Sequence, residues 1–85
     1  MVYMDKKEVG EIIHFFSKIS VAIIKLSDEL IVGDTVSFEG ATTNFSQKIE
    51  SMQVDYESIT KAQKGVEIGV KVKDPVRTGD KVFKV

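Results

Sequence analysis

Few residues of this chain have the type and spacing that catalysis requires. His14 is the only histidine and cysteine is absent, so the ligands of a zinc site cannot be assembled. A serine nucleophile needs a base held by a third group, and no serine lies in a Gly-x-Ser-x-Gly segment. The carboxylates Asp28 and Glu29 lie in a polar stretch typical of a solvated turn. We therefore expect no catalytic site, no metal and no cofactor, and we interpret His14 as a partly buried structural residue.

A basic set near the end of the chain is the strongest candidate for binding. The formal net charge is only -1, but basic residues outnumber acidic ones from residue 61 onward. We expect Lys71 and Lys73 to share the outer face of one strand. Arg77 follows in a loop and Lys81 opens the next strand. Basic side chains that share one surface can contact the phosphates of RNA without reading its bases. We therefore predict that these four residues bind RNA. The alternative is that these lysines only protect sheet edges and remain solvated.

Two similar segments indicate the turns that position these residues. Val32-Gly33-Asp34-Thr35-Val36 and Thr78-Gly79-Asp80-Lys81-Val82 each place Gly-Asp before a strand. Glycine tolerates positive φ, and Asp can bond to nearby backbone groups. We therefore predict positive φ at Gly33 and Gly79. The pair Gly65 and Gly69 is no phosphate loop, because three residues separate them where four are needed.

Alternating hydrophobicity predicts an all-β domain. It is clearest at Val66, Ile68, Val70 and Val72, which we expect to face the core while Lys71 and Lys73 are exposed. A bulge is expected near Ser51, and a loop or single helical turn over Tyr56–Gly65. Six strands separated by turns favour a closed antiparallel barrel. The expected strands are Glu8–Phe16, Ile19–Leu26, Thr35–Glu39, Phe45–Asp55, Val66–Lys73 and Lys81–Val85.

The first two expected strands carry apolar residues on both faces. Strands of this kind are covered on both sides or lie at a contact surface. Of the neighbours Phe15 and Phe16, one ring must face the core and only the other can serve a partner. A surface that includes Phe16, Val21 or Ile23 is therefore a second candidate for binding.

The order of these motifs resembles the second domain of translational GTPases such as elongation factor Tu. The resemblance rests on Val9-Gly10-Glu11-Ile12, Leu30-x-Val32-Gly33-Asp34-x-Val36, Ile49-Glu50-Ser51-Met52, Ala62-x-x-Gly65-x-x-Ile68-Gly69-Val70 and Arg77-x-Gly79-Asp80-x-Val82. It covers nearly the whole chain. The chain is also similar to the barrel appended to some collagenase-like peptidases. The resemblance implies a six-stranded antiparallel Greek-key barrel.

The resemblance also directs the functional interpretation. Our leading hypothesis is a noncatalytic, translation-factor-like module that docks on RNA, the ribosome or an RNA-acting enzyme through Lys71, Lys73, Arg77 and Lys81. The alternative is a protein-interaction barrel that partners a collagenase-like peptidase or another catalytic protein. An enzyme is the remote third reading. We expect a single cytoplasmic domain over residues 1–85, monomeric, with no membrane or DNA partner and with residues 1–7 as a loose tail.

Overall fold

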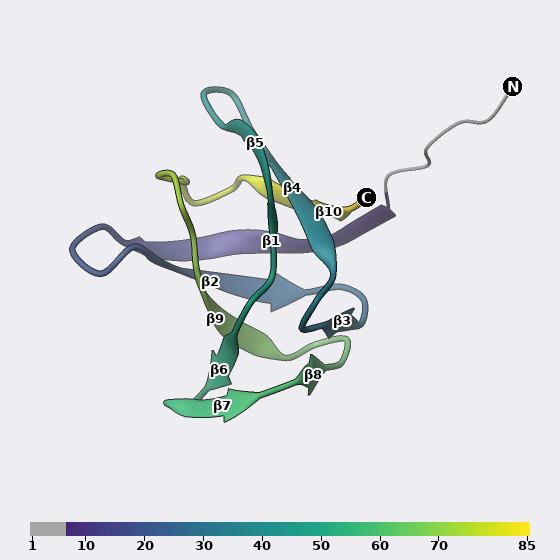
Figure 1. The fold of residues 1–85 in the computed structure, drawn as a ribbon. Helices are drawn as coiled ribbons and strands as arrows, with labels where there is room; N and C mark the ends of the chain where they lie inside the picture. Colours follow the sequence, from purple (N-terminus) through teal and green to yellow (C-terminus); the bar gives the residue numbers. More distant parts are fainter. Residues whose placement is uncertain (1–6) are drawn as a thin grey trace, which may run out of the picture.

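The computed structural model describes residues 7–85, and all regular elements in this range are β-strands (Figure 1). The expected all-β class is confirmed. The loose tail predicted for residues 1–7 lies outside the described residues, except for Lys7, which begins the first strand. Over residues 7–85 no helix has the length and apolar character needed to cross a membrane. The strands are β1 (Lys7–Phe16), β2 (Val21–Leu26), β3 (Leu30–Ile31), β4 (Thr35–Glu39), β5 (Asn44–Lys48), β6 (Met52–Val54), β7 (Glu57–Ile59), β8 (Lys61–Ala62), β9 (Glu67–Lys71) and β10 (Lys81–Lys84).

Eight of these strands form one antiparallel sheet. Its order is β5-β4-β10-β1-β2-β9-β6-β7, and β3 pairs with β8 in a separate two-stranded sheet. The large sheet is strongly curled, as Figure 1 shows, so that its end strand β5 crosses in front of β1 in this view. Its end strands β5 and β7 do not pair with each other, so the sheet is not closed. The six-stranded Greek-key barrel expected from the sequence is therefore not confirmed.

One expected strand is broken in two. The segment predicted as a single strand over Phe45–Asp55 is divided between β5, which begins one residue earlier and pairs with β4, and β6, which pairs with β9 and β7. At the break, the buried Ile49 donates its N–H to the Asp34 carbonyl and accepts from the Gly33 N–H, both at 2.8 Å. The irregularity near Ser51 is thus a change of partner strand, not a bulge within one ladder.

The segment Tyr56–Gly65 contains strands where a loop or helical turn was expected. β6 and β7 form a hairpin through Asp55 and Tyr56, which have φ of 51° and 67°. Left-handed backbone at both central positions is typical of a tight type I′ hairpin turn, which usually contains Asn or Gly. Asp-Tyr carries no such signal, so the prediction of a loop here was wrong.

Two bulges explain the two-faced pattern of β1. The pairing register shifts between Glu8 and Gly10 against β10, and between Ile12 and His14 against β2. A bulge moves the following side chains to the other face, so strict alternation is lost. Beyond the second shift, Phe15 packs against the core and Phe16 is exposed, as expected for these neighbours.

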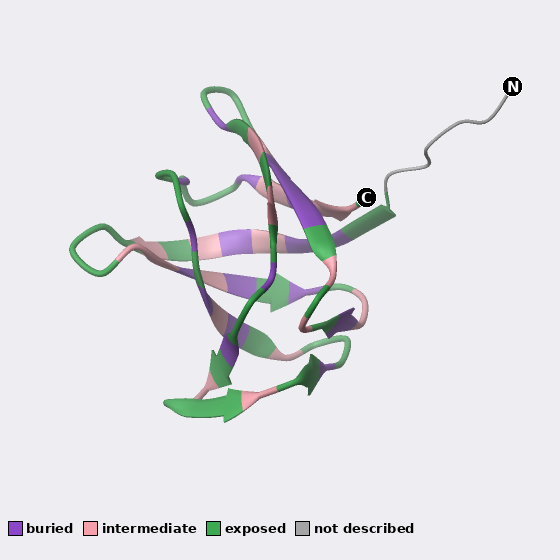
Figure 2. Cartoon of the chain, in the orientation of Figure 1, coloured by how far each residue is buried: buried purple, intermediate pink, exposed green. Residues whose placement is uncertain are grey.

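The core lies inside the curl of the large sheet (Figure 2). Along β9 and its extension, Ile68, Val70 and Val72 are buried and Val66 is partly buried against them. Lys71 and Lys73 are exposed, so the predicted register of this strand is confirmed. The largest fully buried side chains come from segments throughout the described range: Phe38, Ile12, Ile24, Leu30, Ile49, Met52, Ile68, Val9, Val36, Val70 and Val82.

Both Gly-Asp segments form the predicted turns. Gly33 and Gly79 have φ of 104° and 97°. Asp34 donates its N–H to the Ile31 carbonyl and Asp80 to the Arg77 carbonyl, each at 3.0 Å. A glycine with positive φ before the donor residue of such a turn is the type II pattern. Each turn thus reverses the chain immediately before β4 or β10.

Candidate functional site

The side chains that could do chemistry do not gather in the part of the chain that the structure describes. No cluster of three or more His, Asp or Glu residues there could hold a metal ion. His14, expected to be partly buried, is exposed. The register shift beside it turns its ring outward, where it lies 4.3 Å from the Phe16 ring centroid. The prediction of a partly buried structural histidine was therefore wrong.

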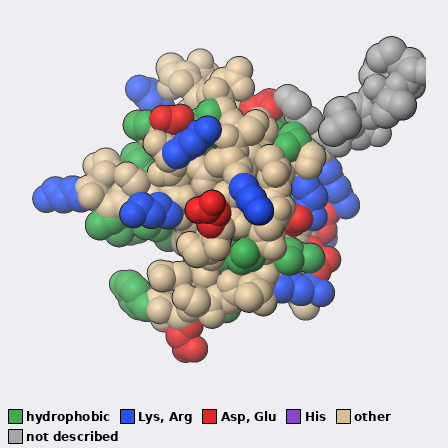
Figure 3. Space-filling view, in the orientation of Figure 1, with side chains coloured by type: hydrophobic (Ala, Val, Ile, Leu, Met, Phe, Trp, Pro, Cys, Tyr) green, Lys and Arg blue, Asp and Glu red, His purple; other side chains and the backbone are tan. Residues whose placement is uncertain are grey.

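An apolar groove lies on the outer face of the sheet. It has a volume of about 550 Å³ and runs between the β1–β2 hairpin and the β6–β7 hairpin. Figure 3 shows hydrophobic side chains on both sides of a notch at the left edge, where the tips of these hairpins lie in the orientation of Figure 1. The lining residues are Phe16, Ile19, Val21, Ile23, Gln53, Asp55, Tyr56, Glu67 and Gly69.

Strand pairing accounts for the floor of the groove. In β1 and β2, Phe16 lies opposite Val21, and Ile23 lies opposite Gly69 of β9. Gly69 in turn pairs with Gln53 of β6. A Cβ on Gly69 would lie 3.5 Å from Val21 and 3.7 Å from Ile23, in ordinary contact. Because glycine has no side chain, the groove stays open beside Val21 and Ile23 at this point.

The walls of the groove carry unusually exposed apolar groups. In the described range, the exposed large hydrophobic residues number five, and three of them line this groove: Phe16, Ile19 and Tyr56. Ile19 is 59% exposed and Tyr56 is 97% exposed. Isolated surface hydrophobics are common, but a contiguous patch with polar residues at its rim marks an interaction site. The arrangement is therefore suited to binding, not to bond making.

The sequence predicted part of this surface. Phe16, Val21 and Ile23, expected as a partner surface, are brought together as predicted. Ile19, Tyr56 and the polar rim were missed. The one available signal was an aromatic residue, Tyr56, in the otherwise polar stretch after β6.

The basic residues predicted to bind RNA lie elsewhere. Lys71 and Lys73 are exposed beside β5, where the side chain of Gln47 bridges them. Gln47 donates to the Lys71 carbonyl and accepts from the Lys73 N–H, both at 2.9 Å. The Lys73 ammonium also lies 5.9 Å from the Phe45 ring centroid. This amide therefore joins β5 to the end of β9 where their backbones do not pair.

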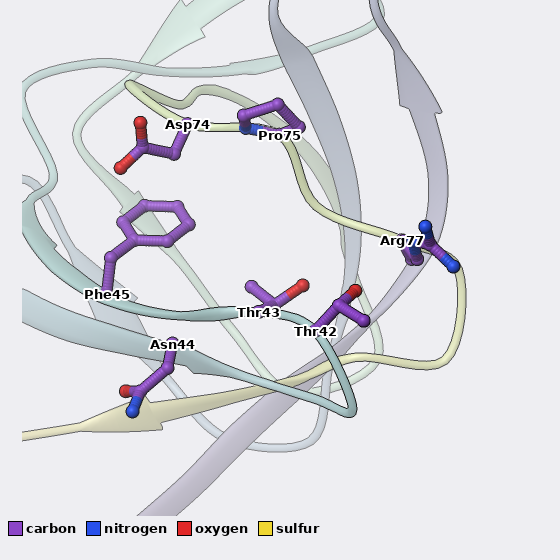
Figure 4. Close-up of a pocket in the computed structure, with 7 residues that line it drawn as sticks. All are labelled: Thr42, Thr43, Asn44, Phe45, Asp74, Pro75 and Arg77. Carbon is purple, nitrogen blue, oxygen red and sulfur yellow. The ribbon is translucent and has the colours of Figure 1, made fainter.

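Arg77 borders a different, more polar depression of about 450 Å³. Figure 4 shows its guanidinium pointing away from Phe45 and Asp74. The hydroxyl of Thr43, also in the lining, is already donated to Asp80. These side chains do not converge on a common point, so the depression offers no evident anion or reaction site.

Lys81 is occupied by carboxylates. Its ammonium lies 3.0 Å from Glu11 and 3.8 Å from Glu8 of β1. The hydrogen bond to Glu11, with the charges of both glutamates, raises the pKa of Lys81 above its usual value. Lys81 is thus paired across the β1–β10 ladder and does not present a free charge beside Lys71, Lys73 and Arg77.

Comparison with known proteins relates the chain to peptidases. No family model matches it. It is 39% identical over 79 residues to an uncharacterized protease of Methanocaldococcus jannaschii and 37% identical over 82 residues to a collagenase of Porphyromonas gingivalis. These matches cover 92% and 94% of this chain but 19% and 23% of the relatives. The chain therefore spans about a fifth of the length of the curated relatives it matches.

Solved structures match over almost the full length. The C-terminal domain of a putative U32 peptidase from Geobacillus thermoleovorans superposes with a TM-score of 0.88 at 23% identity, covering 92% of this chain and 99% of that one. A second crystal structure of that domain gives 0.87 at 20% identity, covering 100% and 98%. The chain shares the fold of that peptidase domain.

These matches overturn the leading interpretation from the sequence. The relatives are proteases and collagenases, not translation elongation factors or RNA-binding proteins. The expected translational, RNA-binding role was therefore wrong. The similarity to a barrel appended to collagenase-like peptidases fits the matches, and the alternative of a peptidase partner fits them better than a role in translation.

Proposed function

We propose that this chain is a noncatalytic interaction domain that docks on the catalytic part of a collagenase-like peptidase through the apolar groove. The observation that carries the proposal is the concentration of Phe16, Ile19 and Tyr56 around one groove. Exposed aromatic and aliphatic residues are typical of the buried centre of a protein interface, where aromatic side chains contribute most of the affinity. The similarity to segments of proteases supports the choice of a peptidase as the partner.

A rigid scaffold supports this role. We propose that β5 and β6 act as one bent strand, so that the curled sheet behaves as a closed barrel. Two features support it: β5 and β6 are consecutive in the chain, and Gln47 bridges β5 to the end of β9. If β5 is held against the end of β9 in this way, the β1–β2 and β6–β7 hairpins would stay at a fixed separation.

A binding measurement tests the docking proposal. The M. jannaschii protease would be produced without the segment that matches this chain, and the purified chain added in trans. We expect a complex by sedimentation velocity and calorimetry that persists in about 0.5 M salt, because burial of apolar surface is insensitive to screening. Absence of a complex with this protease and with the equally shortened P. gingivalis collagenase would contradict the proposal.

Matched variants test whether the groove is the contact. Ile19→Glu places a charge in the groove and should weaken binding about tenfold or more, equivalent to about 1.4 kcal/mol. Ile31→Glu is the control, since Ile31 is 40% exposed and lies outside the groove. Equal weakening by both variants would show that the docking surface lies elsewhere.

A further inference from the structure

The charged residues that line the groove are both acidic. Asp55 and Glu67 are the only ionisable acids or bases among its lining residues, apart from the Tyr56 phenol. Both are exposed, and within residues 7–85 neither forms an ion pair. Lys25 lies opposite Glu67 in the ladder but forms no ion pair with it. The groove thus has an apolar floor, and the two carboxylates at its rim form no ion pair within residues 7–85.

The chain conformation at the rim is strained. Tyr56 has φ of 67°, a value at which bulky residues are disfavoured, whereas Asp tolerates the φ of 51° found at Asp55. Glycine would fill the second position of this turn with less strain. Strained residues persist at binding sites where the side chain has a use. Since the Tyr56 side chain is almost fully exposed, packing within the chain cannot supply that use.

We infer that the groove receives an apolar polypeptide segment that carries a lysine or arginine, with Tyr56 as its anchor. This inference rests on the proposed docking function and specifies its partner. The apolar residues of the segment would cover Val21, Ile23 and Phe16. Its basic side chain would reach Asp55 and Glu67 at the rim. Complementary charge selects among apolar segments that would otherwise bind alike.

Peptide titrations test the charge preference. Three synthetic peptides of about twelve residues would share their apolar residues and differ only in two positions, which are Lys, Gln or Glu. Binding would be followed by fluorescence anisotropy at about 50 mM salt. We expect the Lys peptide to bind at least about threefold more tightly than the Glu peptide, with the Gln peptide between them. Equal binding of all three would overturn the inference.

Charge-removing variants locate the preference. The double variant Asp55→Asn, Glu67→Gln should abolish it, and Asn tolerates the left-handed position of Asp55. The double variant Glu50→Gln, Asp74→Asn removes the same charge from exposed sites outside the groove, and the preference should remain. Loss of the preference in both variants equally would show that net charge and not the rim selects the peptide. Loss in this control alone would place the selecting charges outside the groove. Either result would overturn the inference.

The variant Tyr56→Gly distinguishes the contribution of Tyr56 to peptide binding from its contribution to stability. We expect its melting temperature to be unchanged or higher, because the strain is relieved, and its affinity for the Lys peptide to fall at least about fivefold. Wild-type affinity would overturn the anchoring role. If the shortened protease still binds while the peptides show no charge preference, this inference fails and the docking function stands. Failure of the protease to bind contradicts both.

Discussion

The two Gly-Asp turns make the same local bonds in different surroundings. In the first, the Asp34 carboxylate accepts the Ile31 N–H at 3.0 Å, and in the second the Asp80 carboxylate accepts the Arg77 N–H at 2.8 Å. Each turn also holds a buried isoleucine of a distant segment. Gly79 donates to the Ile12 carbonyl and Ile12 donates to the Asp80 carbonyl, as Gly33, Ile49 and Asp34 do in the first turn.

The surroundings of the two carboxylates differ. Asp80 is 6% exposed and also accepts the hydroxyl of Thr43, itself buried. A Cβ on Gly40 would overlap the Asp80 carboxylate, so the loop after β4 closes directly over it. Asp34 stays near the surface, where it pairs with Lys84 at 3.3 Å. The comparison shows that one local motif can serve as a surface turn or as the centre of a buried polar network.

The largest expected effect is at Asp80. Asp80→Ala leaves the buried Thr43 hydroxyl and the partly buried Arg77 N–H without their acceptor, and a fully buried unsatisfied group costs about 1–3 kcal/mol. We expect the free energy of unfolding to fall by about 2–4 kcal/mol, measured by urea denaturation. Asp34→Ala is the control and should cost about 1 kcal/mol or less. Equal losses of unfolding free energy in the two variants would mean that burial of the second turn adds nothing to stability.

An intermediate effect is expected at the glycines. Gly33→Val and Gly79→Val should each cost about 1–2 kcal/mol, because valine is disfavoured at positive φ. Nothing lies within 4 Å of a Cβ at either position, so backbone conformation alone sets the cost. The two losses should therefore be similar in thermal or chemical unfolding. A much larger loss of stability at Gly79 would show that the two turns also differ in how well their backbones tolerate a β-branched residue.

The smallest effect is expected at Lys84. Lys84→Ala removes the surface ion pair with Asp34 and should cost only about 0.2–0.5 kcal/mol. Because the pair is partly exposed, the difference from the unmutated chain should vanish in about 1 M salt. A loss that persists at high salt would show that the lysine stem contributes by packing instead of by charge.

Features of the fold set by neighbouring residues could be predicted from the sequence. The alternation at Ile68, Val70 and Val72 and the positive φ of Gly33 and Gly79 depend on local geometry, and they were predicted correctly. The bulges of β1 depend on its pairing with two partner strands. In the sequence they appear only as an irregular alternation of apolar and polar residues. The β6–β7 hairpin was missed because Asp-Tyr is not the usual sequence for its turn.

The candidate site depends on pairings that are distant in sequence. Phe16, Val21 and Ile23 lie in one hairpin, so their shared surface could be foreseen. Asp55 and Tyr56 join them because β6 pairs with β9 at Gln53 and Gly69, a contact no local pattern indicates. The pairing of Lys81 was missed for a similar reason, since the carboxylate that accepts its hydrogen bond is 70 residues away in the sequence.

The pairing of the first and last strands has a consequence for engineering. Lys7 of β1 lies opposite Lys84 of β10, while the other end of β1 leads into the hairpin beside the groove. At about 3.3 Å per residue, the ten residues of β1 separate the two ends of the strand by about 30 Å. A short linker could join residues 7 and 85, and the chain could be opened at another exposed turn. Such a circular permutant would keep the groove intact, with its new ends at a chosen distance from it.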